Sequence, residues 1–433
     1  METTGLGELR ARWKILVATV IGACLGSSGL AFYSQGLFYG PISKAFGVHT
    51  SQITVAGLYG VPLALACAYP FGRLVDRVGP RRVALCGIPM FAACIAACAM
   101  YQGPFWGFQV VFMVMTVLGI GTGPTIYTRI ASAHFTLARG KALGLTLAGL
   151  GLAGFLLPTP LTLIIQAGGY RAGYLAMACL ALLALPLVIL LVPSDRTRNT
   201  SQRQRDQGTK AIVPTAGETA GWGAGPALRS PTYLLMVALF LLSCIATTAI
   251  FVQLSSILQN RGESPLQAAS AVSLAGLGVI IGRAGIGALM DYLFPTLIAA
   301  PLFVITAFAV SLLLIPAASG LWLISALVAG LALGAEGDMV AILIAKYFGL
   351  RSYGTLYAVG YALFGPVGAT VGPYLSAVQF EWTGSYTAAI ITSMVLLVIS
   401  SVLALVLPRR ALQPENGGLV APTRRSDTAL ADG

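Results

Sequence analysis

The chain has 433 residues, of which 57% are hydrophobic and 9% are charged, and 26 Lys and Arg residues against 14 Asp and Glu residues give a formal net charge of +12. A soluble protein carries about 25% charged residues, so this composition excludes a soluble globular protein and predicts a surface that mostly faces lipid. The basic residues lie between apolar runs instead of forming one basic domain, which excludes a nucleic-acid-binding protein.

Twelve apolar runs in the sequence are long enough, at roughly 20 residues each, to cross a bilayer. The first six are residues 14–39, 51–71, 82–102, 106–132, 142–166 and 171–193. The second six are residues 232–258, 266–289, 296–316, 320–345, 352–378 and 384–407. We therefore predict an all-α membrane protein with twelve transmembrane helices in two pseudo-symmetric six-helix bundles, 14–193 and 232–407.

Three polar segments flank and join these bundles. A short basic segment, 1–13, precedes the first bundle, and a polar segment, 194–231, separates the two. The second bundle is followed by a polar tail, 408–433. Their low hydrophobicity predicts a flexible linker between the bundles and a disordered tail after them.

The first run also has an alternative interpretation. A basic start, an apolar stretch and the sequence Gly22-Ala23-Cys24 faintly resemble a cleaved lipoprotein signal. The apolar run continues well beyond Cys24 and eleven more runs follow, so we expect a membrane span instead. The seven cysteines all lie inside apolar runs without metal-ligand spacing, so we expect neither disulfides nor a metal site.

Lysine and arginine residues concentrate in every second loop. With both termini placed in the cytoplasm, the cytoplasmic segments hold 21 of the 26 basic residues, and the outward loops hold only Lys44, Arg171 and Arg261. Positively charged loops stay on the cytoplasmic side. We therefore predict cytoplasmic termini in a plasma membrane, which is the inner membrane in a bacterium, and an attraction of the basic loops to anionic lipid.

A charged segment separates the second and third runs. It reads Gly72-Arg73-Leu74-Val75-Asp76-Arg77-Val78-Gly79-Pro80-Arg81-Arg82, and five of its eleven residues are ionised. Its two glycines and its proline predict a break of the helix within the segment. A reduced copy, Gly287-Ala288-Leu289-Met290-Asp291, follows at the corresponding place in the second half and indicates an internal duplication.

Ionisable residues inside the predicted spans are the candidates for chemistry, because a charge in hydrocarbon is costly. Arg283 stands eight residues before Asp291, so roughly 12 Å of helix separates it from the membrane boundary. A guanidinium at that depth requires an anion, which is either a substrate carboxylate or a protein carboxylate such as Glu336 or Asp338.

Glu336 and Asp338 lie two residues apart in the tenth run. This spacing turns the helix by about 200°, so the two side chains cannot face the same cavity. We expect one of them to line the cavity and to carry a proton. Arg129 lies near the end of the fourth run, where it can either pair structurally or act in gating.

Aromatic residues at helical spacing are candidates for the wall of a cavity. Tyr33 and Phe38 lie in the first run, Tyr127 in the fourth and Tyr361 in the eleventh. Tyrosine offers an apolar face together with a hydroxyl donor, although each of these residues alone is more often a packing residue than a ligand contact. The sequence has no nucleophile–base arrangement and no phosphate-binding loop, which argues against an enzyme, a cofactor and an ATP-driven pump.

The segment from Gly72 to Arg82, placed between the second and third spans, resembles the signature of the major facilitator superfamily. The resemblance covers residues 10–410 and implies two bundles around a central cavity that opens alternately to each side. In that family the segment locks the outward-facing state. For this chain the resemblance implies gating roles for Gly72, Asp76, Arg77, Gly79, Arg81 and, less directly, Arg129 and Asp291. Asp76 is expected to lie against the N-terminal end of the eleventh helix.

Shorter motifs narrow the resemblance. Gly282-Arg283 followed by Gly287 and Asp291 is similar to the end of span eight in monocarboxylate transporters and oxalate–formate exchangers, where the arginine holds the substrate carboxylate. The sequences Phe32-Tyr33-Ser34-Gln35-Gly36-Leu37-Phe38 and Arg139-Gly140-Lys141 are also similar to that group. Two lysines of the group, one in span one and one in span eleven, are missing here. One cation at mid-depth suits a monocarboxylate better than a dicarboxylate.

These observations predict a secondary active transporter, working as a monomer, that moves a small organic anion with a proton. Arg283 is the expected anion site, with Tyr33, Phe38, Tyr127 and Tyr361 in the cavity wall. A first alternative is an exporter of an amphipathic or cationic compound, in which Glu336 or Asp338 binds the cation and Arg283 pairs with it. A second alternative is a membrane sensor that binds a solute without moving it.

Overall fold

The computed structural model describes residues 5–193, 221–290, 292–315, 320–349 and 351–408. Within these ranges the chain is almost entirely helical, and its only β pairing is an isolated bridge between Gly221 and Gly349. Most of the linker, the tail after residue 408, and Asp291 lie outside the described residues, so the expectations for them stay predictions.

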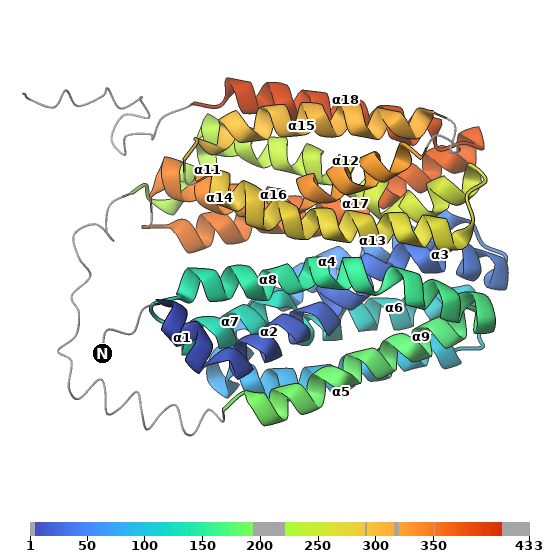
Figure 1. Ribbon diagram of the computed structural model, residues 1–433, viewed down its shortest axis with the longest axis horizontal. Coiled ribbons are helices and arrows are strands. Elements are labelled where there is room, and N and C mark those ends of the chain that lie inside the picture. Colours follow the sequence, from blue (N-terminus) through green and yellow to red (C-terminus); the bar gives the residue numbers. More distant parts are fainter. Residues whose placement is uncertain (1–4, 194–220, 291, 316–319, 350, 409–433) are drawn as a thin grey trace, which may run out of the picture.

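The first half of the chain forms one helical bundle, which is blue to green in Figure 1. Apart from the short helix at residues 5–11, its helices follow the apolar runs that we predicted between residues 14 and 193. In chain order they are α1 (Gly5–Ala11), α2 (Trp13–Leu25), η1 (Ser27–Ala31), α3 (Phe32–Phe46), α4 (Thr50–Val78), α5 (Pro80–Met100), α6 (Phe105–Gly119), η2 (Ile120–Thr122), α7 (Pro124–His134), α8 (Arg139–Leu156) and α9 (Pro158–Leu191).

The second half forms a similar bundle, which is yellow to red in Figure 1 and lies alongside the first. Its first helix is formed by the end of the linker, which we had predicted to be flexible. The helices are α11 (Ala224–Arg229), α12 (Pro231–Asn260), α13 (Pro265–Ile281), η3 (Gly282–Ile286), α14 (Gly287–Leu289), α15 (Pro295–Ser311), η4 (Leu312–Leu314), α16 (Trp322–Phe348), α17 (Tyr353–Thr383) and α18 (Thr387–Val406).

Not every described helix is long and apolar enough to cross a membrane. In the described ranges nine helices are long and apolar enough to cross a membrane, and a tenth span results if the bent pair Trp13–Leu25 and Ser27–Phe46 is counted as one. Helices α8 and α17 follow the fifth and eleventh predicted runs but are not among these nine, and both are rich in glycine. Helix α9 contains a turn at Gly169, whose φ of 72° ends one helix and begins the next.

The first span is interrupted at its centre. Gly26 has an extended backbone, Ser27–Ala31 forms a π turn, and the helices on either side are bent by 43°. This interruption contacts the break between α6 and α7 at Ile120–Thr122. The Ser27 N–H donates to Thr122 Oγ1 at 3.1 Å, and the Ser27 hydroxyl donates to the Gly119 carbonyl at 2.8 Å. Side-chain and backbone partners therefore satisfy the polar groups that the breaks expose.

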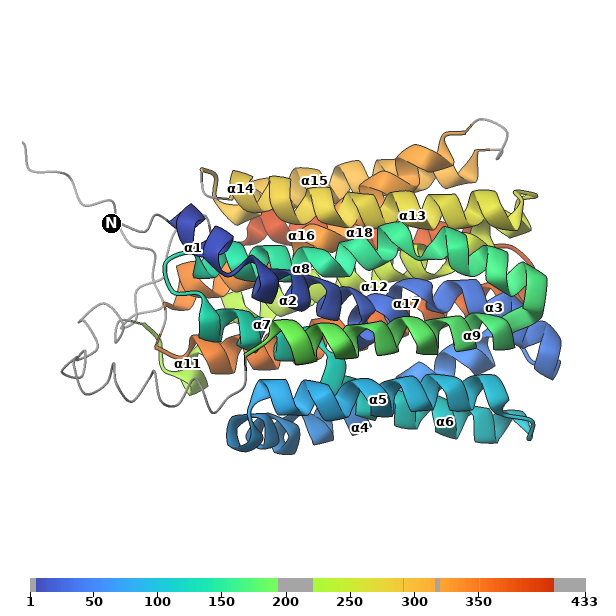
Figure 2. The ribbon, with the colours of Figure 1, turned by 60° about the horizontal axis from the view of Figure 1, so that its bottom comes forward.

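The two bundles contact each other mainly at one end. We call the end of the molecule with α1 and α11, on the left in Figure 1, the terminal face, and the opposite end the distal face. Helix α8 packs on α13, α4 on α17 and α3 on α12; Figure 2 shows α8 alongside α13. Toward the distal face, Thr159 and Ser273 hydroxyls lie 3.2 Å apart, and a Cβ on Gly276 would lie 2.1 Å from the Gly154 backbone.

The same helix surfaces separate toward the terminal face. Gly151 of α8 touches Ile280 of α13, and a Cβ there would lie 2.7 Å from the Ile280 side chain. About two turns nearer the terminal face on α8, Gly144 has no atom within 4 Å of an added Cβ. On the facing helix, beyond the π turn Gly282–Ile286, Gly287 has none either. The molecule is therefore closed between its halves at the distal face and open at the terminal face.

Candidate functional site

Arg283 lies on an irregular turn near the centre of the molecule. It belongs to the π turn Gly282–Ile286, which separates α13 from the short helix α14. Glycines allow this segment to approach α16 closely, since a Cβ on Gly282 would lie 2.2 Å from the Leu331 carbonyl oxygen. Single π turns inside helices are frequent at functional sites because they redirect one side chain.

The guanidinium of Arg283 is only partly paired. Its Nη1 atom lies 3.4 Å from Asp338 Oδ1, which is long for a charged hydrogen bond. Its Nε atom is buried and has no hydrogen-bond partner among the described residues. A guanidinium has five N–H donors, so most of its capacity to bind an anion is unused in the described part of the chain.

Helix α16 directs its two carboxylates to different places. Asp338 faces Arg283 and keeps 31% of its side chain exposed. Glu336 is 2% exposed and accepts a hydrogen bond of 3.2 Å from the Thr247 hydroxyl of α12, inside the second bundle. The two carboxylates therefore lie in different environments: Glu336 is buried within the second bundle, and Asp338 lies beside the partly exposed guanidinium of Arg283.

Tyrosines from both halves surround Arg283. Tyr33 of α3 and Tyr361 of α17 both lie close enough to Arg283, and to each other, for an electrostatic interaction. The Tyr33 ring packs against Gly154 of α8 and meets the Phe251 ring of α12 edge-on, with centroids 5.3 Å apart. The arginine therefore stands where the two bundles meet, beside residues from each.

Two predicted cavity residues lie elsewhere. Phe38 is 2% exposed and stacks on Tyr174 of α9 at a centroid distance of 4.3 Å, inside the first bundle. Tyr127 is fully buried against Gly22 of α2, and its hydroxyl has no partner in the described part of the chain. The structure does not bring Phe38 or Tyr127 together with Arg283, and their binding roles stay predictions.

The charged segment after span two breaks at one glycine only. Helix α4 continues through Gly72 as far as Val78, and the chain turns at Gly79, whose φ is 92°. The Arg81 side chain donates to the Val192 and Ile189 carbonyls at 2.8 and 3.0 Å, so it caps the end of α9. Arg77 and Arg129 are exposed on their helices, and the side chain of Asp76 lies outside the described atoms.

Glu381, which we had not singled out in the sequence, forms hydrogen bonds across the two halves. Glu381, at the end of α17, accepts from the backbone N–H and the hydroxyl of Ser51 at 2.8 and 2.7 Å, and so joins the halves at the distal face. Ser51 lies in the first turn of α4, where free N–H groups attract an anion. The His49-Thr50-Ser51-Gln52 sequence signals a helix start, but nothing local identifies a partner 330 positions away.

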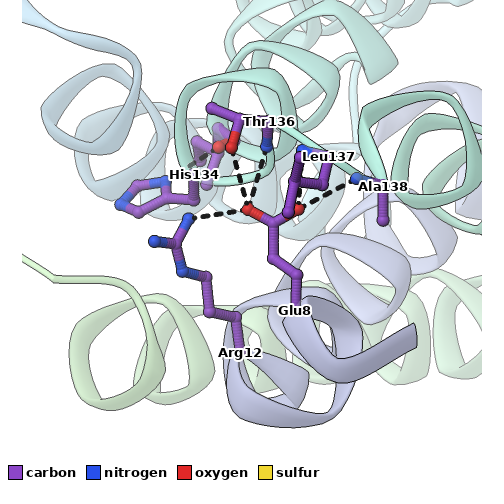
Figure 3. A network of polar contacts seen from close by, with 7 residues as sticks. Glu8, Arg12, His134, Thr136, Leu137 and Ala138 are labelled. Carbon is purple, nitrogen blue, oxygen red and sulfur yellow. Dashed lines mark hydrogen bonds and ion pairs between the residues drawn. The ribbon is translucent and has the colours of Figure 1, made fainter. Parts of the chain in front are cut away.

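Glu8 of α1 binds the start of α8 (Figure 3). Its carboxylate accepts from the backbone N–H groups of Thr136, Leu137 and Ala138 at 2.9–3.0 Å, from the Thr136 hydroxyl, and from Arg12 at 3.3 Å. Burial alone would raise the pKa of Glu8, but these hydrogen bonds favour the carboxylate and together lower the pKa below its ordinary value.

Comparison with known families and proteins identifies relatives of this chain. A family model described as Major Facilitator Superfamily matches residues 21–373. The chain is 26% identical to monocarboxylate transporter 13 of Rattus norvegicus over 407 residues, which cover 92% of this chain and 89% of the relative. It is 26% identical to a 3-(3-hydroxy-phenyl)propionate transporter of Escherichia coli strain K12 over 365 residues, which cover 80% and 82%.

Solved structures show the same fold. A bacterial homologue of the human lysosomal transporter Spinster, in an inward-facing and unoccupied conformation, superposes with a TM-score of 0.66 at 15% identity, covering 92% of this chain and 96% of that one. The occupied inward-facing conformation of that homologue gives a TM-score of 0.60 at 13% identity, with the same coverage. At this identity the likeness extends to the fold alone.

Proposed function

Since the chain belongs to the Major Facilitator Superfamily, we propose that it is a secondary active transporter that moves a monocarboxylate together with a proton by alternating access. The chain is a transporter and not an enzyme, with a small organic substrate and a multi-span membrane location. The substrate class, the coupling to protons and the inner-membrane location belong to the proposal.

The observation that carries the proposal is the half-paired guanidinium of Arg283. Its buried Nε has no partner among the described residues, and its contact with Asp338 is long. A carboxylate binds a guanidinium through two parallel hydrogen bonds, which is the kind of partner this side chain lacks. The monocarboxylate transporter and the 3-(3-hydroxy-phenyl)propionate transporter are both named for carrying monocarboxylates, which supports the same substrate class.

Asp338 gives a route to proton coupling. An ionised Asp338 competes with the substrate carboxylate for Arg283, whereas a protonated Asp338 releases the guanidinium. Binding of one proton to the Asp338 carboxylate and of one monocarboxylate to Arg283 then conserves the charge of the site. Glu336, buried beside Thr247, is the second candidate for the proton. We expect coupling through at least one of the two.

The separation of the two halves supports alternating access. The halves touch near the distal face and separate near the terminal face, so a solute reaches Arg283 from the side that holds the termini. By the distribution of basic residues, we propose that this side is the cytoplasm of a cell with the protein in its plasma membrane. One chain supplies both halves of the site, so we propose a working monomer.

One observation favours the alternative exporter of a cationic or amphipathic compound. Arg283 has a protein carboxylate beside it already, so the pair Arg283–Asp338 can be read as a structural ion pair, with Glu336 left to bind a cation. The two functions differ in the residue on which binding depends: Arg283 for a carboxylate, and Glu336 for a cation.

Proteoliposomes test this choice. Wild-type protein is expected to take up labelled monocarboxylates under an inward proton gradient, and Arg283→Gln is expected to lose this uptake. Arg171→Gln is the matched control, because Arg171 lies far from the site and bonds to Tyr170. Uptake of organic cations that depends on Glu336 and survives Arg283→Gln would overturn the proposal in favour of the exporter. Tight carboxylate binding without flux in intact vesicles would identify a sensor.

A further inference from the structure

Three tyrosines form a stack along one side of α17. Tyr353, Tyr357 and Tyr361 lie one helical turn apart, so their side chains share a face of the helix. The rings of Tyr353 and Tyr357 are 5.9 Å apart with an interplanar angle of 11°, and those of Tyr357 and Tyr361 are 5.8 Å apart with 22°. We call these three residues the tyrosine ladder.

The ladder runs from the terminal face to Arg283. Tyr353 is the first residue of α17, at the terminal face. At the other end, Tyr357 and Tyr361 both lie within electrostatic range of Arg283, and Tyr357 also lies within range of Asp338. The ladder therefore lines the open side of the molecule up to the proposed anion site.

The face of the ladder is turned toward the opening between the halves. The adjacent face of α17 is buried on α12, where Tyr233 donates to the Leu356 carbonyl and the Phe364 ring lies beside Phe240. Tyr361 in contrast keeps 43% of its surface exposed. Tyr33 of the first half lies close enough to interact with it, so this exposed surface faces the other bundle and not lipid.

Aromatic rings also pack where α3 meets α12. Phe32 of α3 and Phe251 of α12 are parallel at a centroid distance of 6.3 Å, and Tyr33 meets Phe251 edge-on. Tyr33 and Phe251 are buried, with 6% and 2% of their surfaces exposed, whereas Tyr361 is 43% exposed. The ring face that is open beside Arg283 is therefore that of Tyr361. An open ring face accepts a planar ring by offset stacking or by edge-to-face contact better than it accepts a branched aliphatic chain.

We propose that the carried monocarboxylate is an aromatic acid, whose ring stacks on Tyr361 while its carboxylate, a few bonds away, binds Arg283. This inference rests on the proposed function, because it takes Arg283 as the carboxylate site. The ladder supplies selectivity: Tyr361 holds the ring in the site, and Tyr357 and Tyr353 offer further ring faces along the path to the terminal face.

Calorimetric titration of the purified full chain with phenylacetate and cyclohexylacetate tests the proposal, since the two acids share carboxylate, chain length and approximate size. Wild-type protein is expected to bind phenylacetate about tenfold more tightly, which is the upper range for an aromatic pair. Tyr361→Leu is expected to reduce this preference to below about twofold, with the larger loss of affinity falling on phenylacetate, and Tyr361→Phe is expected to keep the preference. Tyr292→Leu, at a tyrosine that is 86% exposed, is the matched control.

The outcomes separate this inference from the function on which it rests. Equal binding of the two acids by wild-type protein, with both lost in Arg283→Gln, would overturn the aromatic substrate and leave the monocarboxylate carrier intact. A preference for phenylacetate that Tyr361→Leu retains would overturn the role of the ladder. Failure of every carboxylate, aromatic or aliphatic, to bind would overturn the proposed function itself.

Discussion

Glu8 and Arg283 are both charged side chains largely withdrawn from solvent, and the structure treats them in opposite ways. Glu8 receives hydrogen bonds from three backbone N–H groups, one hydroxyl and one guanidinium. Arg283 has one long contact to Asp338 and a buried Nε that is unpaired within the described residues. The Glu8 carboxylate is therefore hydrogen-bonded through both oxygens within the protein. The Arg283 guanidinium keeps N–H donors that no described residue accepts.

The difference teaches how to distinguish a structural charge from a binding charge. Nearly all buried polar groups in folded proteins are hydrogen-bonded, so an unsatisfied donor requires an explanation. At Glu8 the bonded groups hold α1 against the start of α8, which is a fixed joint within the first half (Figure 3). At Arg283 the missing partner and the neighbouring tyrosines of both halves are the basis of the ligand site that we propose.

Asp338→Asn, which changes the carboxylate partner of Arg283, is expected to have the largest effect on transport. An asparagine neither ionises nor competes for Arg283, so carboxylate exchange across the membrane is expected to continue while proton-driven accumulation is lost. A gradient of two pH units supports up to about 100-fold accumulation by a one-proton carrier, and the ratio is expected to fall to about 1 in the variant. Uptake and counterflow in the same proteoliposomes measure both quantities. Undiminished accumulation would exclude Asp338 and leave Glu336 as the candidate.

Arg283→Lys sharpens the comparison by keeping the charge and removing the fork of donors. A lysine ammonium cannot bind a carboxylate through two parallel hydrogen bonds. Loss of one charged hydrogen bond is expected to weaken carboxylate binding by about tenfold to 100-fold. The melting temperature is expected to stay close to that of the wild type, because little bonding within the protein is lost. A large fall in melting temperature with unchanged binding would show that Arg283 is structural.

Glu8→Gln is expected to lower stability and to leave carboxylate binding unchanged, which is the opposite of the result expected for Arg283→Lys. The Gln amide nitrogen cannot accept the N–H groups of Leu137 and Ala138, so unfolding is expected about 2–4 °C lower at neutral pH, with carboxylate affinity unchanged. The folded pKa of Glu8 lies below the ordinary value of 4.5, so the stabilisation is present above pH 4.5 and is lost as the pH falls through the folded pKa. Melting curves of both proteins are therefore expected to converge at acid pH.

Glu381 lies between these two cases, because it is exposed yet bonded across the halves. Glu381→Gln removes the charge that faces the first turn of α4 and weakens the bonds to Ser51. Exposed interactions of this kind contribute about 0.5–1 kcal/mol, so we expect a twofold to fivefold shift toward opening at the distal face. Labelling of a cysteine placed near Ser51 reports this shift, with a cysteine at the exposed Gln102, in a distal loop of the first half, as the control. Unchanged labelling would exclude a role of Glu381 in closing the distal face.

The sequence predicted the features that depend on long stretches or on large energies. The two sets of apolar runs follow from bilayer thickness. The cost of a charge at mid-depth singles out Arg283 in the sequence, and its role in binding stays a prediction. The choice between Glu336 and Asp338 required the direction of α16. The contacts of Glu8 with residues 136–138 and of Glu381 with Ser51 join segments about 130 and 330 residues apart, for which the sequence carries no local signal. Phe38 and Tyr127 have helical spacing that packing residues also have, so spacing alone does not assign their surroundings.

The backbone contact of Gly154 with Gly276 has a consequence for how closely the two halves can approach. The two main chains meet directly at this point, beside the ring of Tyr33. A single added methyl at Gly276 would hold α8 and α13 apart and prevent this contact from forming. Such a protein would rest with its distal side open, and it offers a route to trap and study the opposite half of the transport cycle.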